Sequence, residues 1–279
     1  MKKILWIASY PKSGNTYMRS LLSSLIYTKD GEFNFKLLKK IKQFDISENY
    51  QFVHKIDRHD YSNLDDIKVV SKYWEMAQKR INEAGESFIF KTHAANLMWK
   101  NYKYTDELRT LGVIYLIRDP RDVVVSYAHH FDKDIDTVIN KMIRVDAITT
   151  NPRKTIGIPL SSWNFHIQSW EKLNVPKLFI RYEDLIREPN KVFSKVIEFL
   201  KNNLKINFAI NKQKFNSIIK NTNFKSLKKM EMEGGFPEQI STRVFFRKGI
   251  YEAGKELNDA RSYKIISNFN NLMKRFNYI

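Results

Sequence analysis

Cysteine is absent from the 279 residues of this chain. The protein therefore has no disulfide, no thiol nucleophile and no thiolate metal site. Long apolar runs are also missing, and none approaches the roughly 20 residues that a membrane-spanning helix needs. The short apolar start, Ile4–Ala8, runs directly into Tyr10 and Pro11 without a typical cleavage site, which argues against a signal peptide. We expect a cytoplasmic protein that does not span a membrane.

Acidic residues are scarce relative to basic ones. Lys and Arg number 48 and Asp and Glu number 30, which gives a formal charge of +18. Such an excess is typical of proteins that bind nucleic acid, a membrane surface or a phosphorylated ligand, but it also arises when lysines cover solvent-exposed faces. The basic runs Lys39-Lys40 and Lys228-Lys229 are only pairs, so the charge pattern does not decide between these alternatives.

Short apolar runs alternate with helical patterns along the chain. The composition, 43% hydrophobic and 14% aromatic, is that of a globular protein. The alternation predicts an α/β fold with a central parallel sheet flanked by helices. In the absence of repeats and linkers, we expect a single domain over residues 1–279. The predicted strands are 4–9, 87–91, 113–117 and 178–182; the main helices are 16–27, 120–131, 163–170, 189–200 and 259–276; loops are expected at 149–159 and 234–254.

An anion-binding loop is predicted between the first strand and the first helix. This loop is Tyr10-Pro11-Lys12-Ser13-Gly14-Asn15-Thr16. The first amides of a helix lack partners within the helix and carry the positive end of its dipole, so they bind phosphate or sulfate groups. Gly14 allows close approach of the backbone, and Lys12 adds a positive charge. The alternative is an ordinary turn with a surface lysine. The loop is not a Walker A motif, because Lys12 precedes Gly14 and no glycine stands upstream.

A second anion site is predicted at the end of the third strand. Arg118 lies at the carboxyl end of that strand, where parallel sheets collect ligands, and its guanidinium can bind phosphate with two hydrogen bonds. Ser126 lies two turns along the following helix and can reach a more distant part of the same ligand. The alternative is that Arg118 pairs with Asp119 or Asp122.

A candidate base follows the second strand, in Lys91-Thr92-His93. A single histidine is more often structural than catalytic. The position of His93 at a strand's carboxyl end, with Lys91 on the same side, distinguishes it from the other five: His54, His59, His129, His130 and His166. A histidine with a pKa near its free value of about 6.5 can take a hydroxyl proton at neutral pH.

Five segments, in order, resemble motifs of the sulfotransferases that use 3′-phosphoadenylyl sulfate (PAPS), especially the cytosolic-type branch. The anion-binding loop resembles their P-loop-like 5′-phosphosulfate loop, and the segment from Arg118 to Tyr127 is similar to their 3′-phosphate motif. The other three are Tyr182-Glu183-Asp184-Leu185, Thr222-Asn223-Phe224 and Arg247-Lys248-Gly249. Lys91-Thr92-His93 also falls where the family has its Lys-Thr-His base.

The resemblance implies a role for each matching residue. The 5′-phosphosulfate would be held by Lys12, Ser13, Gly14, Asn15 and Thr16. The 3′-phosphate would be held by Arg118, Ser126, Arg247, Lys248 and Gly249. The adenine would lie among Tyr17, Tyr182, Thr222 and Phe224. His93 would be the catalytic base, with Lys12 and Lys91 stabilising the charge that develops.

The implied reaction moves a sulfuryl group from PAPS to a hydroxyl, or less readily an amine, of a small-molecule acceptor, with 3′-phosphoadenosine 5′-phosphate (PAP) as product. It needs no metal, and neither nucleic acid nor membrane is expected as a partner. One rival is a nucleotide-dependent kinase with Mg²⁺ on Asp119 or Asp122. The other is a non-enzymatic polyanion-binding protein, whose binding would fall steeply with salt.

The sequence departs from the family in three places. Tyr17 stands where the family often has a tryptophan that stacks on the adenine. Glu252-Ala253-Gly254-Lys255 replaces the usual Gly-x-Trp-Lys after the Arg-Lys-Gly motif, and the family's dimer segment is not evident. We expect the acceptor pocket to be built from residues 28–98, 149–159 and 231–254, without a sign of which acceptor it takes.

Overall fold

The computed structural model describes residues 3–84, 88–150, 156–239, 244–247, 249 and 252–279. The chain forms two compact units, each taken by itself below. The first comprises Met1–Tyr10, Gln43–Tyr115 and Asn140–Lys177, and the second comprises Pro11–Lys42, Leu116–Ile139 and Leu178–Ile279.

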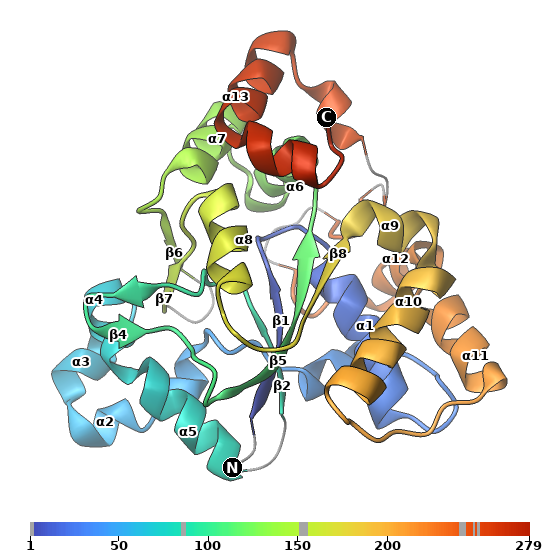
Figure 1. Ribbon diagram of the computed structural model, residues 1–279, viewed down its shortest axis with the longest axis horizontal. Helices are drawn as coiled ribbons and strands as arrows, with labels where there is room; N and C mark the ends of the chain where they lie inside the picture. Colours follow the sequence, from blue (N-terminus) through green and yellow to red (C-terminus); the bar gives the residue numbers. More distant parts are fainter. Residues whose placement is uncertain (1–2, 85–87, 151–155, 240–243, 248, 250–251) are drawn as a thin grey trace. The chain divides into compact units, whose positions relative to one another are not determined.

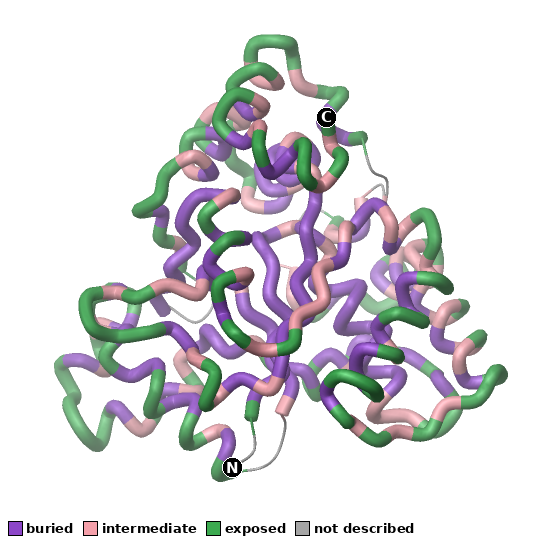
Figure 2. Tube along the Cα trace, viewed as in Figure 1, coloured by how far each residue is buried: buried purple, intermediate pink, exposed green. Residues whose placement is uncertain are grey.

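A four-stranded sheet has the strand order β2-β1-β5-β8. Its strands are β1 (Ile4–Ser9), β2 (Ile89–Thr92), β5 (Thr110–Ile117) and β8 (Lys177–Arg181). β1 and β2 are parallel, with Leu5 opposite Ile89 and Ala8 opposite Thr92. Each residue of β1 and β2 is buried, as a strand covered on both faces requires, and Figure 2 shows this continuous burial. The predicted α/β fold with a central parallel sheet is confirmed.

The first unit surrounds β1 and β2 with short helices and two small hairpins. Figure 1 shows α2 to α5 gathered beside β4. A buried aromatic group that includes Phe44, Tyr50 and Trp74 fills its interior, so these residues are core. The elements are η2 (Ser47–Tyr50), α2 (Val53–Ile56), α3 (Arg58–Ser62), α4 (Ile67–Val70), η3 (Ser71–Tyr73), α5 (Trp74–Ala84), β3 (Met98–Trp99), β4 (Tyr102–Lys103), β6 (Ile148–Thr150), β7 (Gly157–Pro159) and α8 (Trp163–Glu171).

The prediction of a loop throughout 149–159 is wrong at both of its ends. β6 and β7 pair there as antiparallel strands, with Ile148 opposite Pro159 and Thr150 opposite Gly157. The glycine and proline favoured a loop, but Pro159 is the last residue of an edge strand, where no donor is required of it. Its carbonyl accepts from Ala95 N–H at 2.7 Å. Residues 151–155 lie outside the described part of the chain.

The second unit is mainly helical. In it, α11 packs against both α1 and α12, and α13 packs against α6 (Figure 1). Its elements are α1 (Asn15–Tyr27), η1 (Phe35–Lys40), α6 (Pro120–Phe131), α9 (Tyr182–Arg187), α10 (Pro189–Glu198), η4 (Phe199–Asn203), α11 (Lys212–Thr222), α12 (Phe224–Gly234), η5 (Ala253–Glu256) and α13 (Asp259–Arg275), and α7 (Ile135–Ile143) begins in it. Among the described residues, no helix is both long and apolar enough to span a membrane.

Candidate functional site

The predicted anion-binding loop forms a turn directly before α1. Lys12 and Gly14 both have left-handed backbones, with φ of 66° and 97°, and α1 begins directly after them at Asn15. The Ser13 hydroxyl is buried and has no hydrogen-bond partner among the residues that the structure describes. A buried hydroxyl without a partner costs about 1–3 kcal/mol. An oxyanion bound in this turn would satisfy it, so these residues fit a phosphate or sulfate group.

Only glycine fits at position 14 of this turn. Its φ of 97° strains any other residue, and an added Cβ would lie 2.5 Å from Cδ2 of Tyr182. Tyr182 itself is buried at the start of α9. The turn therefore packs directly against one of the residues predicted to contact the adenine.

Arg118 is joined to the same turn. Its Nη1 donates to the carbonyl of Lys12 at 3.0 Å, and its guanidinium carbon lies 4.4 Å from the centre of the Tyr182 ring. Nη2 lies 3.6 Å from Oδ2 of Asp122, so the pairing considered as an alternative is present. The ion pair does not exclude anion binding, because a guanidinium has five donors.

Both carboxylates of the rival magnesium site are occupied by protein donors. Asp119 caps α6 through the Arg121 N–H at 2.9 Å and pairs with the Arg121 guanidinium at 2.6 Å. Asp122 accepts the backbone N–H groups of Glu252 at 2.9 Å and Gly254 at 2.6 Å, besides its pair with Arg118. Burial raises the pKa of the Asp122 carboxyl, which Arg118 partly offsets. These contacts leave both carboxylates serving the protein's own structure.

Of the residues predicted to surround the adenine, Tyr17 and Tyr182 lie close to each other. Tyr17 is buried on α1, and burial with the nearby Tyr182 raises its pKa to about 12. The Thr222 hydroxyl is buried and donates to Ile218 O at 2.8 Å, within α11. The Thr222 side chain is fully buried, and its hydroxyl proton is used within its own helix.

The Arg-Lys-Gly segment meets α12. An added Cβ at Gly249, whose φ is 61°, would lie inside contact distance of the Phe224 ring. Lys228 donates from Nζ to Arg247 O at 3.2 Å, and Arg247 pairs with Glu256 at 3.2 Å. Lys248, predicted to bind the 3′-phosphate, lies outside the described residues. Ser126 is half-buried on α6.

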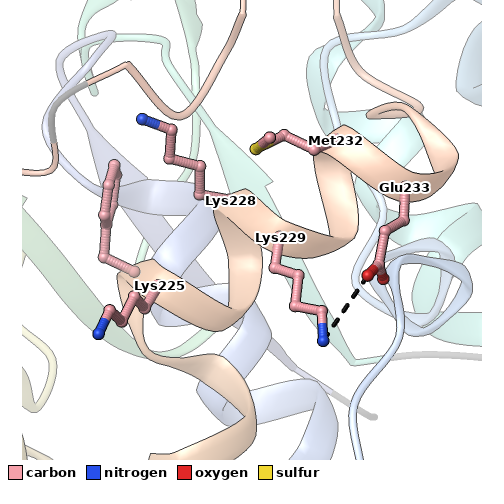
Figure 3. A pocket seen from close by; sticks show the side chains of 6 residues that line it. Lys225, Lys228, Lys229, Met232 and Glu233 are labelled. Atoms are coloured by element: carbon pink, nitrogen blue, oxygen red, sulfur yellow. Dashed lines mark ion pairs between the residues drawn. The ribbon is translucent and has the colours of Figure 1, made fainter.

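A surface pocket of about 460 Å³ runs along α12. Figure 3 shows its lining, in which a dashed line joins Lys229 to Glu233, 3.7 Å apart. Phe224 at one end belongs to the predicted nucleotide site. The lining residues are Phe224, Lys225, Lys228, Lys229, Met232 and Glu233.

His93 follows β2 in the first unit, and its ring orientation is defined. Parallel register places it beside the end of β1, where Nδ1 lies 2.9 Å from the carbonyl oxygen of Ser9 and 3.3 Å from its hydroxyl. A carbonyl only accepts, so Nδ1 carries the proton and Nε2 is the basic nitrogen. Lys91, two residues earlier, is 8% exposed.

A fully buried histidine, His166, hydrogen-bonds to the backbone of His93. His166 Nε2 lies 3.0 Å from the carbonyl of His93 and therefore donates to it, while Nδ1 accepts from Tyr115 OH at 2.6 Å. Burial lowers the pKa of His166 to about 4, so this ring is neutral at pH 7. His166 lies in the helix predicted over 163–170, and no sequence motif indicated a role for it.

A model of the sulfotransferase domain matches residues 2–276 of the chain. The chain belongs to the sulfotransferase family. Bovine (Bos taurus) sulfotransferase 1A1 is 24% identical over 261 residues, covering 88% of this sulfotransferase and 75% of the relative. Cytosolic sulfotransferase 12 of Arabidopsis thaliana is 32% identical over 148 residues, which are 49% of this chain and 42% of the relative. The expected enzyme class is confirmed.

Solved structures confirm the sulfotransferase fold. Mouse sulfotransferase SULT7A1 complexed with PAP is similar, with a TM-score of 0.60 and 17% identity, over 98% of this chain and 85% of that one. Retinol dehydratase in a complex with retinol and PAP has a TM-score of 0.63 and 19% identity, over 98% and 82%.

In this sulfotransferase, the site residues predicted from the sequence motifs include two groups, one in each unit. Lys12, Gly14, Arg118 and Tyr182 meet in the second unit, and Lys91 and His93 lie together in the first. The motifs missed four residues around His93: Ser9, His166 and Asp45 hydrogen-bond to it, and Tyr115 hydrogen-bonds to His166. No spacing rule connects those four, because their separations along the chain reflect the fold.

Proposed function

We propose that this sulfotransferase transfers a sulfuryl group from PAPS to a hydroxyl of a small-molecule acceptor, and that residues 1–279 act as one domain. The geometry around Gly14 carries the proposal: a left-handed turn at the start of α1, with the buried Ser13 hydroxyl and the Arg118 guanidinium beside it. The family match over 2–276 and the two similar structures with PAP support it.

The donor would bind through two groups of residues. Its 5′-phosphosulfate would lie on the amides and side chains of Ser13, Gly14, Asn15 and Thr16, next to Lys12. Arg118, Ser126, Arg247, Lys248 and Gly249 would hold the 3′-phosphate, and Tyr17, Tyr182, Thr222 and Phe224 would contact the adenine. The Arg118 bond to the Lys12 carbonyl supports this division, since it ties the phosphate-binding arginine to the phosphosulfate turn.

In the proposed reaction, Nε2 of His93 takes the proton of the acceptor hydroxyl. The acceptor oxygen forms a bond to sulfur as the bond from sulfur to the 5′-phosphate oxygen breaks, and that oxygen keeps the electron pair and leaves as part of PAP. Lys12, Lys91 and the first amides of α1 stabilise the negative charge that develops on the leaving phosphate. The Ser9 contact supports the choice of Nε2, because it commits Nδ1 to donation.

The proposal needs no metal ion. The transferring sulfuryl group carries less negative charge than a phosphoryl group, so lysines and helix amides can stabilise it. Asp119 and Asp122, the carboxylates of the kinase alternative, are held by Arg121, Arg118 and two backbone amides.

We place the enzyme in the cytoplasm, with neither nucleic acid nor a membrane as partner. The Arabidopsis relative is named a cytosolic sulfotransferase. The excess of positive charge, +18, is then accounted for by an anionic nucleotide donor and by solvent-exposed lysines.

Crystals soaked with PAP test the proposed donor site directly. We expect the 5′-phosphate in the turn at 10–16 and the 3′-phosphate at Arg118. A nucleotide bound anywhere else would overturn the assignment.

Turnover with labelled PAPS and a panel of phenols, sugars and sterols tests the reaction and identifies the acceptor class. We expect labelled product that survives EDTA. No product from PAPS, together with phosphate transfer from ATP that EDTA abolishes, would support the kinase alternative instead.

A further inference from the structure

Asp45 is a buried carboxylate that neither the sequence motifs nor the proposed reaction uses. It lies in the first unit and is 3% exposed. Thr92 Oγ1 donates to its Oδ2 at 2.7 Å, and Tyr104 OH donates to its Oδ1 at 2.8 Å. The backbone N–H of His93 donates to the same carboxylate. Asp45 thus contacts both residues that form the Thr92–His93 peptide.

The backbone explains how Asp45 reaches this peptide. Gln43 forms a parallel bridge with Lys91, and the Phe44 N–H donates to Lys91 O at 2.9 Å. In parallel register, Asp45 then lies next to His93. Asn49 fixes the segment by donating from Nδ2 to Phe44 O at 2.8 Å and Gln43 O at 3.2 Å. The position of the carboxylate is therefore set by several independent contacts.

Stability alone does not account for a carboxylate at this place. Burial raises the pKa of Asp45 from 3.8 to about 6, against the lowering effect of its hydrogen bonds. In the described part of the chain no basic side chain forms an ion pair with it. An amide or apolar side chain here would avoid the cost of burying a charge.

Asp45 is one of three residues whose hydrogen bonds together fix the position of His93. Its carboxylate accepts the His93 N–H, His166 donates to the His93 carbonyl at 3.0 Å, and Ser9 accepts from Nδ1 at 2.9 Å. Together they fix the peptide before the residue, the peptide after it and the ring.

We propose that Asp45 is a positioning residue for His93: it holds the Thr92–His93 peptide so that Nδ1–H stays on the Ser9 carbonyl and Nε2 remains the basic nitrogen. The proposal rests on the proposed function for the role of His93 as base. The position and tautomer of the ring, however, are properties of the free protein and can be measured without PAPS.

Nitrogen-15 NMR of the histidine rings at pH 7.5 tests the proposal, with His93→Gln used to assign the His93 signals. We expect the wild-type ring as a single Nδ1–H tautomer. In Asp45→Asn we expect averaged tautomers and loss of the slowly exchanging Nδ1–H signal. A wild-type His93 spectrum in Asp45→Asn would overturn the proposal.

Asp60→Asn is the matched control. Asp60 is also a buried aspartate of the first unit that accepts from a tyrosine, Tyr73 OH at 2.9 Å, and it pairs with Lys72 at 3.0 Å. We expect its substitution to leave the His93 signals unchanged. Should both substitutions change these signals equally, Asp45 has no specific role. If Asp45→Asn does not fold, Thr92→Val is the second variant. It removes the Thr92 hydrogen bond to Asp45 and the acceptor of the Ala94 N–H, and it is expected to give partial averaging. An unchanged ring there would count against the proposal.

Kinetics with PAPS and 4-nitrophenol provide the second readout. We expect kcat of Asp45→Asn to fall about tenfold to a hundredfold, with KM for PAPS within about twofold of wild type. A larger KM with normal kcat would contradict a role at His93. If the wild-type enzyme sulfates no acceptor, the proposed function fails, while the NMR result still decides the position of the ring.

Discussion

Gly14 shows how a single residue determines whether the turn before α1 can form. Its φ of 97° and the Tyr182 ring 2.5 Å from a hypothetical Cβ exclude a side chain for two separate reasons. The glycine was identified from the sequence because of its place between a strand and a helix. Its contact with Tyr182, which lies 168 positions later, was not readable there.

Gly14→Ala is therefore expected to weaken PAP binding at least about tenfold and to reduce the free energy of unfolding by about 1–3 kcal/mol, the cost of backbone strain. Isothermal titration calorimetry and urea unfolding would measure the two effects. Gly234→Ala is the control, because among the described residues nothing beyond its chain neighbours and its own helix backbone lies within 4 Å of an added Cβ, and its backbone is helical. Equal effects from both substitutions would contradict a specific role for Gly14.

Replacing His93 by alanine tests its proposed role as the catalytic base. We expect His93→Ala to lose turnover by at least about a hundredfold, since positioned general bases contribute about 10²–10⁴-fold. PAP affinity should stay within about twofold, because the residues proposed to bind the donor are others. Normal turnover by this variant would remove His93 from the mechanism.

Among the elements, α12 organises the segment that carries the Arg-Lys-Gly motif. The carboxylate of Glu231, on this helix, accepts the backbone N–H groups of Phe245 at 2.6 Å and Phe246 at 2.9 Å. Phe245 in turn lies under the ammonium of Lys12, 4.0 Å from its ring centre. One carboxylate thus connects α12 to the residues just before Arg247.

Removing this carboxylate is expected to be costly. Glu231→Ala leaves two amides without their acceptor, and we expect the free energy of unfolding to fall by about 2–4 kcal/mol and PAP binding to weaken. Glu233→Ala on the same helix is the control, because its pair with Lys229 is exposed and should contribute under about 1 kcal/mol. Urea unfolding of both variants would measure these free energies. A similar loss of stability in the two variants would refute the role of Glu231.

The sequence predicted the long elements closely because their signals are local. β1 was predicted at its observed bounds, and α6 begins at Pro120 behind the capping Asp119, as expected. The short strands at 148–150 and 157–159 were missed because pairing between them, rather than the residues of either, makes them strands. The same reason hid the bridge between Gln43 and Lys91 that places Asp45.

For the molecule as a whole, burial of ionisable groups links folding to pH. His166 has a pKa of about 4 in the folded protein, against 6.5 when exposed, because burial disfavours its charged form. The unfolded chain therefore binds a proton at a higher pH than the folded one. The stability due to the neutral ring is complete above pH 6.5 and is lost as the pH falls toward 4.

The difference in unfolding free energy between wild type and His166→Gln isolates this effect from other titrating groups. We expect the unfolding free energy of wild type, relative to that of His166→Gln, to fall by up to about 3 kcal/mol as the pH is lowered from 7 to 4. This corresponds to the shift of about two and a half units in the pKa of His166. Urea unfolding at pH steps would measure it. A difference that does not vary with pH would show that His166 is not buried as a neutral ring.

The sequence by itself determined the α/β fold and the family, and it predicted the anion-binding loop, Arg118 and His93 as site residues, because each motif consists of residues close together along the chain. Only the tertiary structure decided which nitrogen of His93 donates to Ser9, that Arg118 donates to the Lys12 carbonyl, and that Asp45 and His166 hydrogen-bond to the backbone of His93. These depend on contacts between distant segments, and burial, not residue type, sets the protonation of the groups involved.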